Sequence, residues 1–108
     1  MNGSALLFGI GLARKAGKLT SGTDMVLDEV RRHGTQTLVV AANDLSAASL
    51  KKIKDHCTYY HAELFVCDAG KEKIGAAIGK PFAACVCVSD ANFAALWKRN
   101  FTNTERKD

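Results

Sequence analysis

The sequence lacks the features that mark several protein classes. Proline occurs once in 108 residues, and there are no internal repeats or low-complexity stretches, which argues against a disordered or collagen-like chain. No apolar run approaches the ~20 residues of a membrane-spanning helix. The apolar stretch Ala5–Ala13 has neither a preceding basic residue nor a following cleavage site, so it does not resemble a signal peptide. We therefore expect a cytoplasmic protein with no membrane partner.

The cysteines lack the spacing of a metal or redox site. Cys57, Cys67, Cys85 and Cys87 include no CxxC pair, and no histidine lies at a zinc-ligand spacing from two of them. Cys85 and Cys87 are two residues apart in the apolar run Phe82–Val88, so a strand there would point both side chains to the same face. We predict four buried thiols that act as small apolar side chains, with no bound metal.

Positive charge is in modest excess and unevenly distributed. Lysine and arginine total 15 against 11 acidic residues, which gives a net charge of +4. Residues 1–20 carry Arg14, Lys15 and Lys18 without any acidic residue, and residues 51–54 hold three more lysines. This distribution favours a polyanionic partner such as RNA.

Helical and strand periodicities alternate along the chain, with short loops between them. Ser4 and Ser46 are expected to cap the first and third helices, and Asp90 to begin the last. The alternation predicts one α/β domain over residues 1–101, a three-layer α/β/α sandwich with a small central mixed sheet, and a polar tail over residues 102–108. Helices are expected within segments 4–17, 22–34, 46–57, 68–80 and 90–97, strands in segments 37–42, 64–67 and 82–88, and an extended link at 18–21.

No motif of catalysis or nucleotide binding is complete. Gly9 and Gly11 begin a dinucleotide-binding pattern, but Arg14 stands in place of its third glycine. The Gly17–Lys18 step resembles part of a phosphate loop, but Leu19 replaces the residue that would bind magnesium. No serine or cysteine lies in a GxSxG pattern. We therefore expect no catalytic residues, no cofactor and no enzyme activity.

Three loops hold the residues that best fit an RNA interface, because a layered fold can gather them at one sheet edge. A helix that starts at Gly22 offers unpaired N–H groups and a positive dipole end to phosphate. Lys18 and Lys80 add charge, and Phe82 offers an apolar surface to an extruded base. Solvated lysines, a core phenylalanine and a turn glycine would explain the same residues without RNA. The loops are residues 18–24, 43–46 and 79–83.

Several segments, in order, resemble one family. They are GLARKAGKLTSGTDMVL, LVVAANDLS, KKIKDHC, EKIGAAIGK and VCVSDANFA, which span about residues 5–97. They are similar to the bacterial ribosomal-protein-like family called YlxQ. That family belongs to the superfamily of kink-turn RNA-binding ribosomal proteins typified by the archaeal proteins L-seven-Ae and L-thirty-e.

The resemblance implies an α/β/α sandwich that binds a sharply bent RNA with tandem sheared G·A pairs and has no enzyme activity. The implied RNA surface comprises the start of the second helix, the loop leading to the third helix, and the loop before the last strand. The matching positions are Gly22, Asp24, Met25 and Asp28 with Thr23 between the first two, then Ser46 and Leu50, then Lys80, Phe82 and Ala83.

Three of these positions depart from the family pattern. Met25 stands where the family has a glutamate, and its thioether cannot accept the hydrogen bonds of a guanine edge. Asp28 stands where a lysine meets phosphate, and a carboxylate there repels phosphate. Asp24 stands where the family motif has an asparagine, and its short carboxylate can accept a hydrogen bond from a base amino group.

Together these observations predict a non-enzymatic, monomeric protein that binds structured RNA. The expected RNA is a kink-turn or ribosomal RNA, with a link to translation and with ribosome-associated proteins as further partners. The alternative is a protein-interaction module of the same fold that has lost kink-turn recognition, which Met25 and Asp28 favour. An enzyme, or the detached RNA-binding part of one, is disfavoured because no cofactor fingerprint is present.

Overall fold

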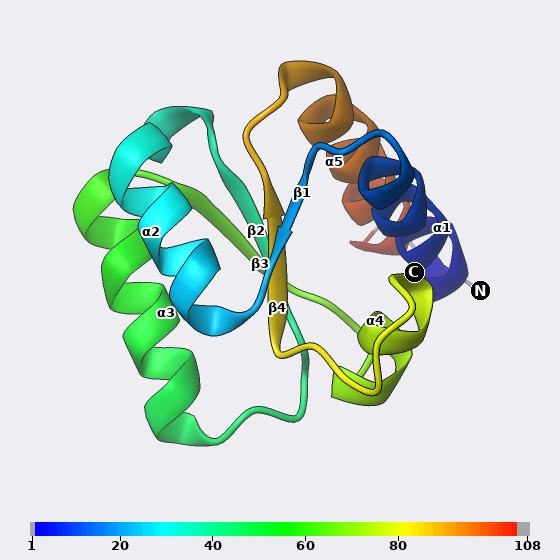
Figure 1. Cartoon of the computed structure of the whole chain (residues 1–108), viewed down its shortest axis with the longest axis horizontal. Helices are drawn as coiled ribbons and strands as arrows, with labels where there is room; N and C mark the ends of the chain where they lie inside the picture. The colour runs from blue at the N-terminus through cyan, green and yellow to red at the C-terminus, as the bar shows by residue number, and fades with distance from the viewer. Residues whose placement is uncertain (1, 106–108) are drawn as a thin grey trace.

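A central sheet is covered by helices on both faces (Figure 1). This computed structural model describes the backbone of residues 2–105 and the side chains of residues 5–100. The helices are α1 (Asn2–Lys15), α2 (Thr23–His33), α3 (Ala47–Tyr60), α4 (Lys71–Ala77) and α5 (Ala91–Glu105), with a short 3-10 helix, η1 (Gly34–Gln36). The strands are β1 (Leu19–Ser21), β2 (Leu38–Ala41), β3 (Glu63–Val66) and β4 (Cys85–Val88).

The sheet is mixed and has the strand order β1-β4-β2-β3. Strands β2 and β3 are parallel because α3 connects them as a crossover, whereas β4 runs antiparallel to both β1 and β2. Every residue of β2 and β4 is buried, as expected for central strands with helices on both faces. Helices α2 and α3 cover one face, and α1, α4 and α5 cover the other (Figure 1). The predicted three-layer α/β/α sandwich is confirmed.

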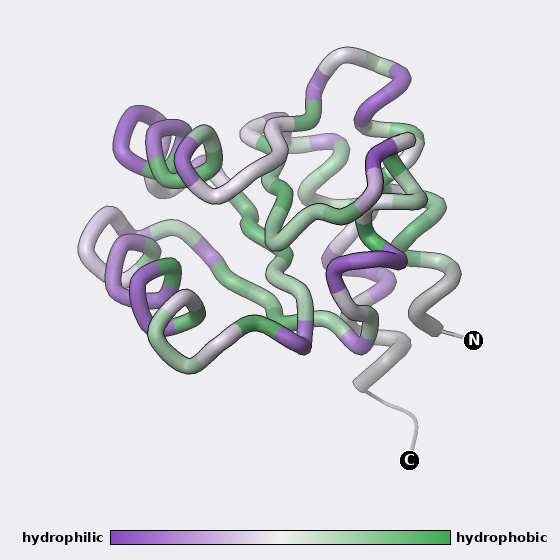
Figure 2. Tube along the Cα trace, turned by 60° about the horizontal axis from the view of Figure 1, so that its bottom comes forward, coloured by the Kyte–Doolittle hydropathy of each residue, from purple (hydrophilic) through white to green (hydrophobic). Residues whose placement is uncertain are grey.

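Alternation along β2 and β4 divides the interior into two apolar clusters. On the α2–α3 side, Val39 and Cys85 pack with Val26 and Ile53, while Trp97 lies among the residues of the opposite side. In Figure 2 the hydrophobic segments run through the middle of the molecule and the hydrophilic ones lie on the outer helices. None of the helices within residues 2–105 has the length and apolar composition to cross a membrane.

All four cysteines are buried free thiols, as predicted. Cys57, Cys85 and Cys87 lie together on the α2–α3 side of the sheet, and Cys67 lies on the other side. Burial raises the pKa of Cys57 and of Cys85 to about 11, and it raises the pKa of Cys87 further. The reactive thiolate form is therefore scarce at neutral pH.

We expect the native protein to react very slowly with a thiol-specific reagent at pH 8 and the denatured protein to react with all four cysteines at once. Both burial and the raised pKa oppose attack in the folded state. Labelling followed by mass spectrometry, with and without denaturant, measures this difference. Fast labelling of any one thiol in the native protein would contradict the buried placement.

Of the helix starts predicted at Ser4, Ser46 and Asp90, the last two are confirmed. The Ser46 hydroxyl accepts the Ser49 N–H at 3.1 Å, and one Asp90 carboxylate oxygen accepts the N–H groups of Asn92 and Phe93 at 2.9 and 3.1 Å. The prediction at Ser4 is wrong, because α1 begins at Asn2 and Ser4 lies inside the helix.

Several segment boundaries also differ from the sequence prediction, including the end of α3, which continues to Tyr60 and so past residue 57. The expected link at residues 18–21 contains a strand, β1, because it pairs with the distant β4. The expected helix within residues 68–80 is limited to Lys71–Ala77. Helix α5 continues through Glu105, past the expected domain end at residue 101, and residues 106–108 of the expected tail lie outside the described chain.

Candidate nucleic-acid interface

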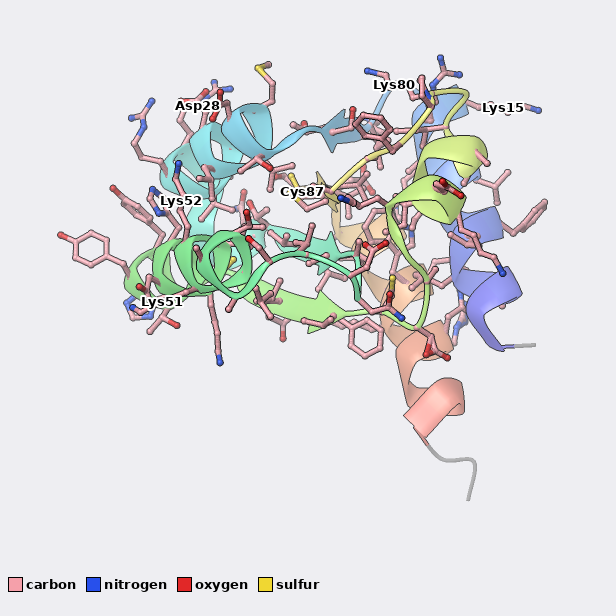
Figure 3. The ribbon with its side chains drawn as sticks, turned by 90° about the horizontal axis from the view of Figure 1, so that it is seen from below. Lys15, Asp28, Lys51, Lys52, Lys80 and Cys87 are labelled. Carbon is pink, nitrogen blue, oxygen red and sulfur yellow. The ribbon has the colours of Figure 1, made fainter. Side chains whose placement is uncertain are left out.

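Three connections meet at one edge of the sheet, where β1 and β2 end and β4 begins. The Gly22 N–H donates to the Cys85 carbonyl at 3.1 Å, which joins the β1–α2 turn to the start of β4. The Ala42 N–H donates to the Ala84 carbonyl at 2.9 Å, which joins the β2–α3 loop to the α4–β4 loop. We call this region the loop edge: residues 22–25, 42–46 and 79–84. The expected gathering of three loops is confirmed for residues 22–24, 43–46 and 79–83, but not for the part of the first loop that holds Lys18. Figure 3 views the molecule from this side.

The start of α2 leaves its first N–H groups without a side-chain cap. Gly22 is the N-cap residue, with φ 94° and ψ 142°, a backbone conformation that favours glycine. Uncapped N–H groups at a helix start, together with the helix dipole, form an anion site. Asp24 and Met25 are exposed beside it, and Thr23 is half-buried.

Asp28 does not present an isolated negative charge. One carboxylate oxygen, Oδ1, lies 2.6 Å from Nη2 of Arg31, and the other, Oδ2, lies 3.1 Å from Nε of Arg32. The hydrogen bond from Arg31 is the main reason that the pKa of Asp28 is lowered. Exposed ion pairs of this kind are weak, so an incoming phosphate can compete for the same arginines. The repulsion expected at this position is therefore offset locally by α2 itself.

The α4–β4 loop presents a cation and an aromatic ring to solvent. Lys80 is exposed and takes part in no ion pair among the described side chains. Phe82 is 65% exposed, which is unusual for so large an apolar side chain. Two backbone bonds hold the loop, from the Lys80 N–H to the Gly75 carbonyl and from the Ala83 N–H to the Lys71 carbonyl. The loop is thus anchored to α4 at both ends.

Ala83 differs from the other residues of the implied RNA surface because it is only 6% exposed. Its methyl group packs in the apolar cluster with α1, α4 and α5. The expectation that Ala83 contacts RNA is therefore not supported by its placement. Burial of Ala83 fixes the chain next to Phe82, which itself stays outside the core.

Lys18 does not join the loop edge. It precedes β1, whereas Gly22 follows that strand, and the four residue steps of extended chain between them span about 13 Å. Its ammonium group lies 3.9 Å from Asp90, beyond the opposite end of the sheet. The prediction that Lys18 assists Gly22 is wrong, because the segment between them is an extended strand and not a turn.

The two implied contacts of α3 have structural roles at the loop edge. The Ser46 hydroxyl caps α3, as described above, and remains exposed. Leu50 is half-buried and packs against the cluster between α2 and α3. Ser46 directly precedes α3 and Leu50 lies in its first turn, so both are beside the β2–α3 loop.

Asp44, which the sequence suggested only as part of a turn, fixes the loop edge from within. One of its carboxylate oxygens accepts a hydrogen bond from the Lys71 N–H at 3.0 Å. A residue of the β2–α3 loop therefore supplies the hydrogen-bond acceptor for the first N–H of α4. A side chain on Gly70 would collide with this carboxylate, since an ideal Cβ there lies 2.7 Å from Asp44 Oδ2. Nothing local in the sequence predicts a bond across 27 residues.

Gly75 is the second residue that sequence reasoning missed. An ideal Cβ at this position would lie 2.4 Å from Phe82 Cα and 2.8 Å from the Lys80 carbonyl oxygen. Only glycine therefore lets the α4–β4 loop approach α4 this closely. The available signal was a glycine inside an otherwise helical pattern, which commonly marks a close backbone approach.

No metal centre accompanies the loop edge. Within the part of the chain that the structure describes, no three side chains of histidine, cysteine, aspartate or glutamate gather as metal ligands would. The loop edge therefore consists of a free helix start, an exposed cation and an exposed aromatic ring on a rigid layered fold.

The fold and the order of its elements define a class of protein. Residues 5–95 match the model of the ribosomal protein L7Ae/L30e/S12e/Gadd45 family, and the chain belongs to this family. The resemblance drawn from the sequence is confirmed.

Two curated relatives are similar to this chain in sequence. The RNA-binding protein YlxQ of Bacillus subtilis (strain 168) is 35% identical over 85 residues, which cover 79% of this chain and 83% of the relative. The RNA-binding protein YlxQ of Enterococcus faecium is 39% identical over 72 residues, which cover 67% of this chain and 68% of the relative.

Two solved structures have the same architecture. A protein of unknown function from Bacillus halodurans C superimposes with a TM-score of 0.76 at 31% identity, over 86% of this chain and 96% of its own. The Giardia lamblia 15.5kD RNA binding protein superimposes with a TM-score of 0.77 at 15% identity, over 96% of this chain and 88% of its own. At that identity the second likeness shows a shared fold alone.

Proposed function

We propose that this protein is a non-enzymatic RNA-binding protein and that the loop edge is its RNA interface. The observation that carries the proposal is the exposure of Lys80 and Phe82 beside the uncapped start of α2. The names of the two YlxQ relatives support it, since each is called an RNA-binding protein. The RNA is a kink-turn or a similarly bent structured RNA, connected with the ribosome or translation, and one protein copy binds it.

The proposed contacts follow from the chemistry at the loop edge. A phosphate receives hydrogen bonds from the first N–H groups of α2 next to Gly22, and the Lys80 ammonium group supplies charge nearby. Phe82 stacks on a base that is extruded from the RNA helix at its bend, as aromatic side chains do with unpaired RNA bases. Asp24 accepts a hydrogen bond from a base amino group.

Met25 and Asp28 adapt this interface without removing it. The Met25 side chain is 62% exposed at the start of α2 and contacts a base or sugar through its apolar surface. Arg31 and Arg32 of α2, which both pair with Asp28, are available to the adjacent phosphates. The result is a surface that favours bent RNA by shape and charge more than by hydrogen bonds to guanine.

The test compares a kink-turn RNA with a plain duplex of equal length, each titrated with the protein at several salt concentrations. We expect tighter binding of the kink-turn RNA. Lys80→Gln should weaken binding and reduce the slope of log K against log salt by about 1, because one phosphate contact is lost. Phe82→Ala should weaken binding by about 5- to 100-fold, the usual effect of one lost base stack.

Two variants serve as matched controls. Arg99→Gln makes the same charge change on α5, which lies on the opposite side of Figure 3 from Lys80. Tyr59→Ala removes a ring of similar exposure from the far end of α3. If control and site variants changed RNA affinity equally, or if both RNAs bound with equal affinity, general electrostatic attraction would explain the binding. No binding of either RNA would favour the protein-interaction module of the same fold.

A further inference from the structure

A groove between α1 and α4 begins next to the loop edge. It encloses about 400 Å³, and Phe8 and Leu12 on its wall are 69% and 37% exposed. Its lining includes no acidic residue, and the whole of α1, Asn2–Lys15, has none. We call this feature the α1–α4 groove; it is lined by Leu7, Phe8, Gly11, Leu12, Arg14, Lys15, Ala77, Ile78 and Gly79.

Three cations surround the end of the groove that adjoins the loop edge. Arg14 and Lys15 form the last turn of α1, and neither takes part in an ion pair among the described side chains. An ideal Cβ on Gly79 would lie 3.9 Å from the guanidinium carbon of Arg14, and Lys80 follows Gly79 directly. Figure 3 shows Lys15 and Lys80 on the same side of the molecule, away from Lys51 and Lys52 of α3.

The exposed face of α1 carries apolar side chains and a cation in one line. Phe8, Leu12 and Lys15 are spaced at i, i+4 and i+7, so they share one helix face, and about 10 Å of helix separates the first from the last. A stripe with an exposed aromatic ring at one end and cations at the other is how proteins follow single-stranded nucleic acid: the cations meet the phosphates and the ring stacks on a base.

We infer that the α1–α4 groove holds a short unpaired RNA segment that leaves the bent RNA at the loop edge. This inference rests on the proposed function and extends its RNA surface. The strand passes Lys80, its phosphates contact Arg14 and Lys15, and one base stacks on Phe8. The continuity through Gly79–Lys80 favours RNA over an acidic peptide, because Gly79 lines the groove and directly precedes Lys80 of the loop edge.

The experiment uses one kink-turn RNA in two forms, blunt-ended and with six unpaired uridines added to either strand in turn. In the unaltered protein we expect one extension to tighten binding by about tenfold, within the range of one base stack on an aromatic ring. Arg14→Gln with Lys15→Gln, or Phe8→Ala, should remove this gain and leave the affinity for the blunt RNA nearly unchanged. The α3 variants Lys54→Gln and Tyr59→Ala should retain the gain.

The outcomes separate this inference from the function on which it rests. Equal binding of blunt and extended RNA, or a gain that survives in the Arg14, Lys15 and Phe8 variants, overturns the groove assignment while the loop edge stands. If neither RNA binds, the proposed function fails as well. Binding of an acidic amphipathic peptide that depends on Phe8, with no effect of the extensions, would assign the groove to a protein partner and overturn the inference.

Discussion

Gly75→Ala is expected to abolish most RNA binding while the protein stays folded. The new methyl group would lie 2.4 Å from Phe82 Cα, a backbone atom, so the α4–β4 loop must move away from α4. Overpacking of this kind costs about 1–3 kcal/mol of stability. The displaced loop also moves Lys80 and Phe82 from the start of α2, so the loss in affinity should match or exceed the roughly 5- to 100-fold of a single lost base stack.

Titration with kink-turn RNA and chemical denaturation measure the two effects in parallel. Ala76→Gly is the matched control, because it weakens the same helix by about 1 kcal/mol through backbone entropy and leaves Gly75 in place. We expect this control to bind RNA normally. If Gly75→Ala also bound RNA with unchanged affinity, the position of the α4–β4 loop would not matter for recognition.

The second large effect is expected at Trp97, whose replacement by alanine should lower the free energy of unfolding by about 3–5 kcal/mol. Trp97 is fully buried and is among the largest side chains in the core. It packs against α1, where an ideal Cβ on Gly9 would lie 3.2 Å from its ring. Since small domains are stable by about 5–15 kcal/mol, this one change removes a large fraction of the total.

Trp97→Phe provides a sharp comparison in the same denaturation experiment. The indole N–H of Trp97 has no hydrogen-bond partner in the described part of the chain, so phenylalanine keeps much of the apolar contact and loses no hydrogen bond. We expect it to cost much less than alanine. A loss below about 1 kcal/mol for Trp97→Ala would contradict the assigned role of this side chain in the core.

Part of the loop edge could be predicted from the sequence. Gly22 is predicted at a helix start because glycine followed by a polar residue ends an extended link and favours the start of a helix, and both effects are local. The loop positions of Lys80 and Phe82 are predicted because residues 79–83 join a recognisable helix to a recognisable strand. Lys18 was misplaced because the three residues of β1 are too few to show an alternating pattern, and their conformation is set by pairing with β4.

Local patterns alone predict the order of the main elements, the layered α/β/α class, the cap at Ser46 and the burial of all four cysteines. These depend on periodicity, capping and apolar character, which act between residues close in the chain or on each residue alone. Three other features depend on how the chain packs: the cap that Asp44 provides to α4, the need for glycine at position 75 and the burial of Ala83. Each of these is a contact or an enclosure created by chain packing, and no local pattern encodes it.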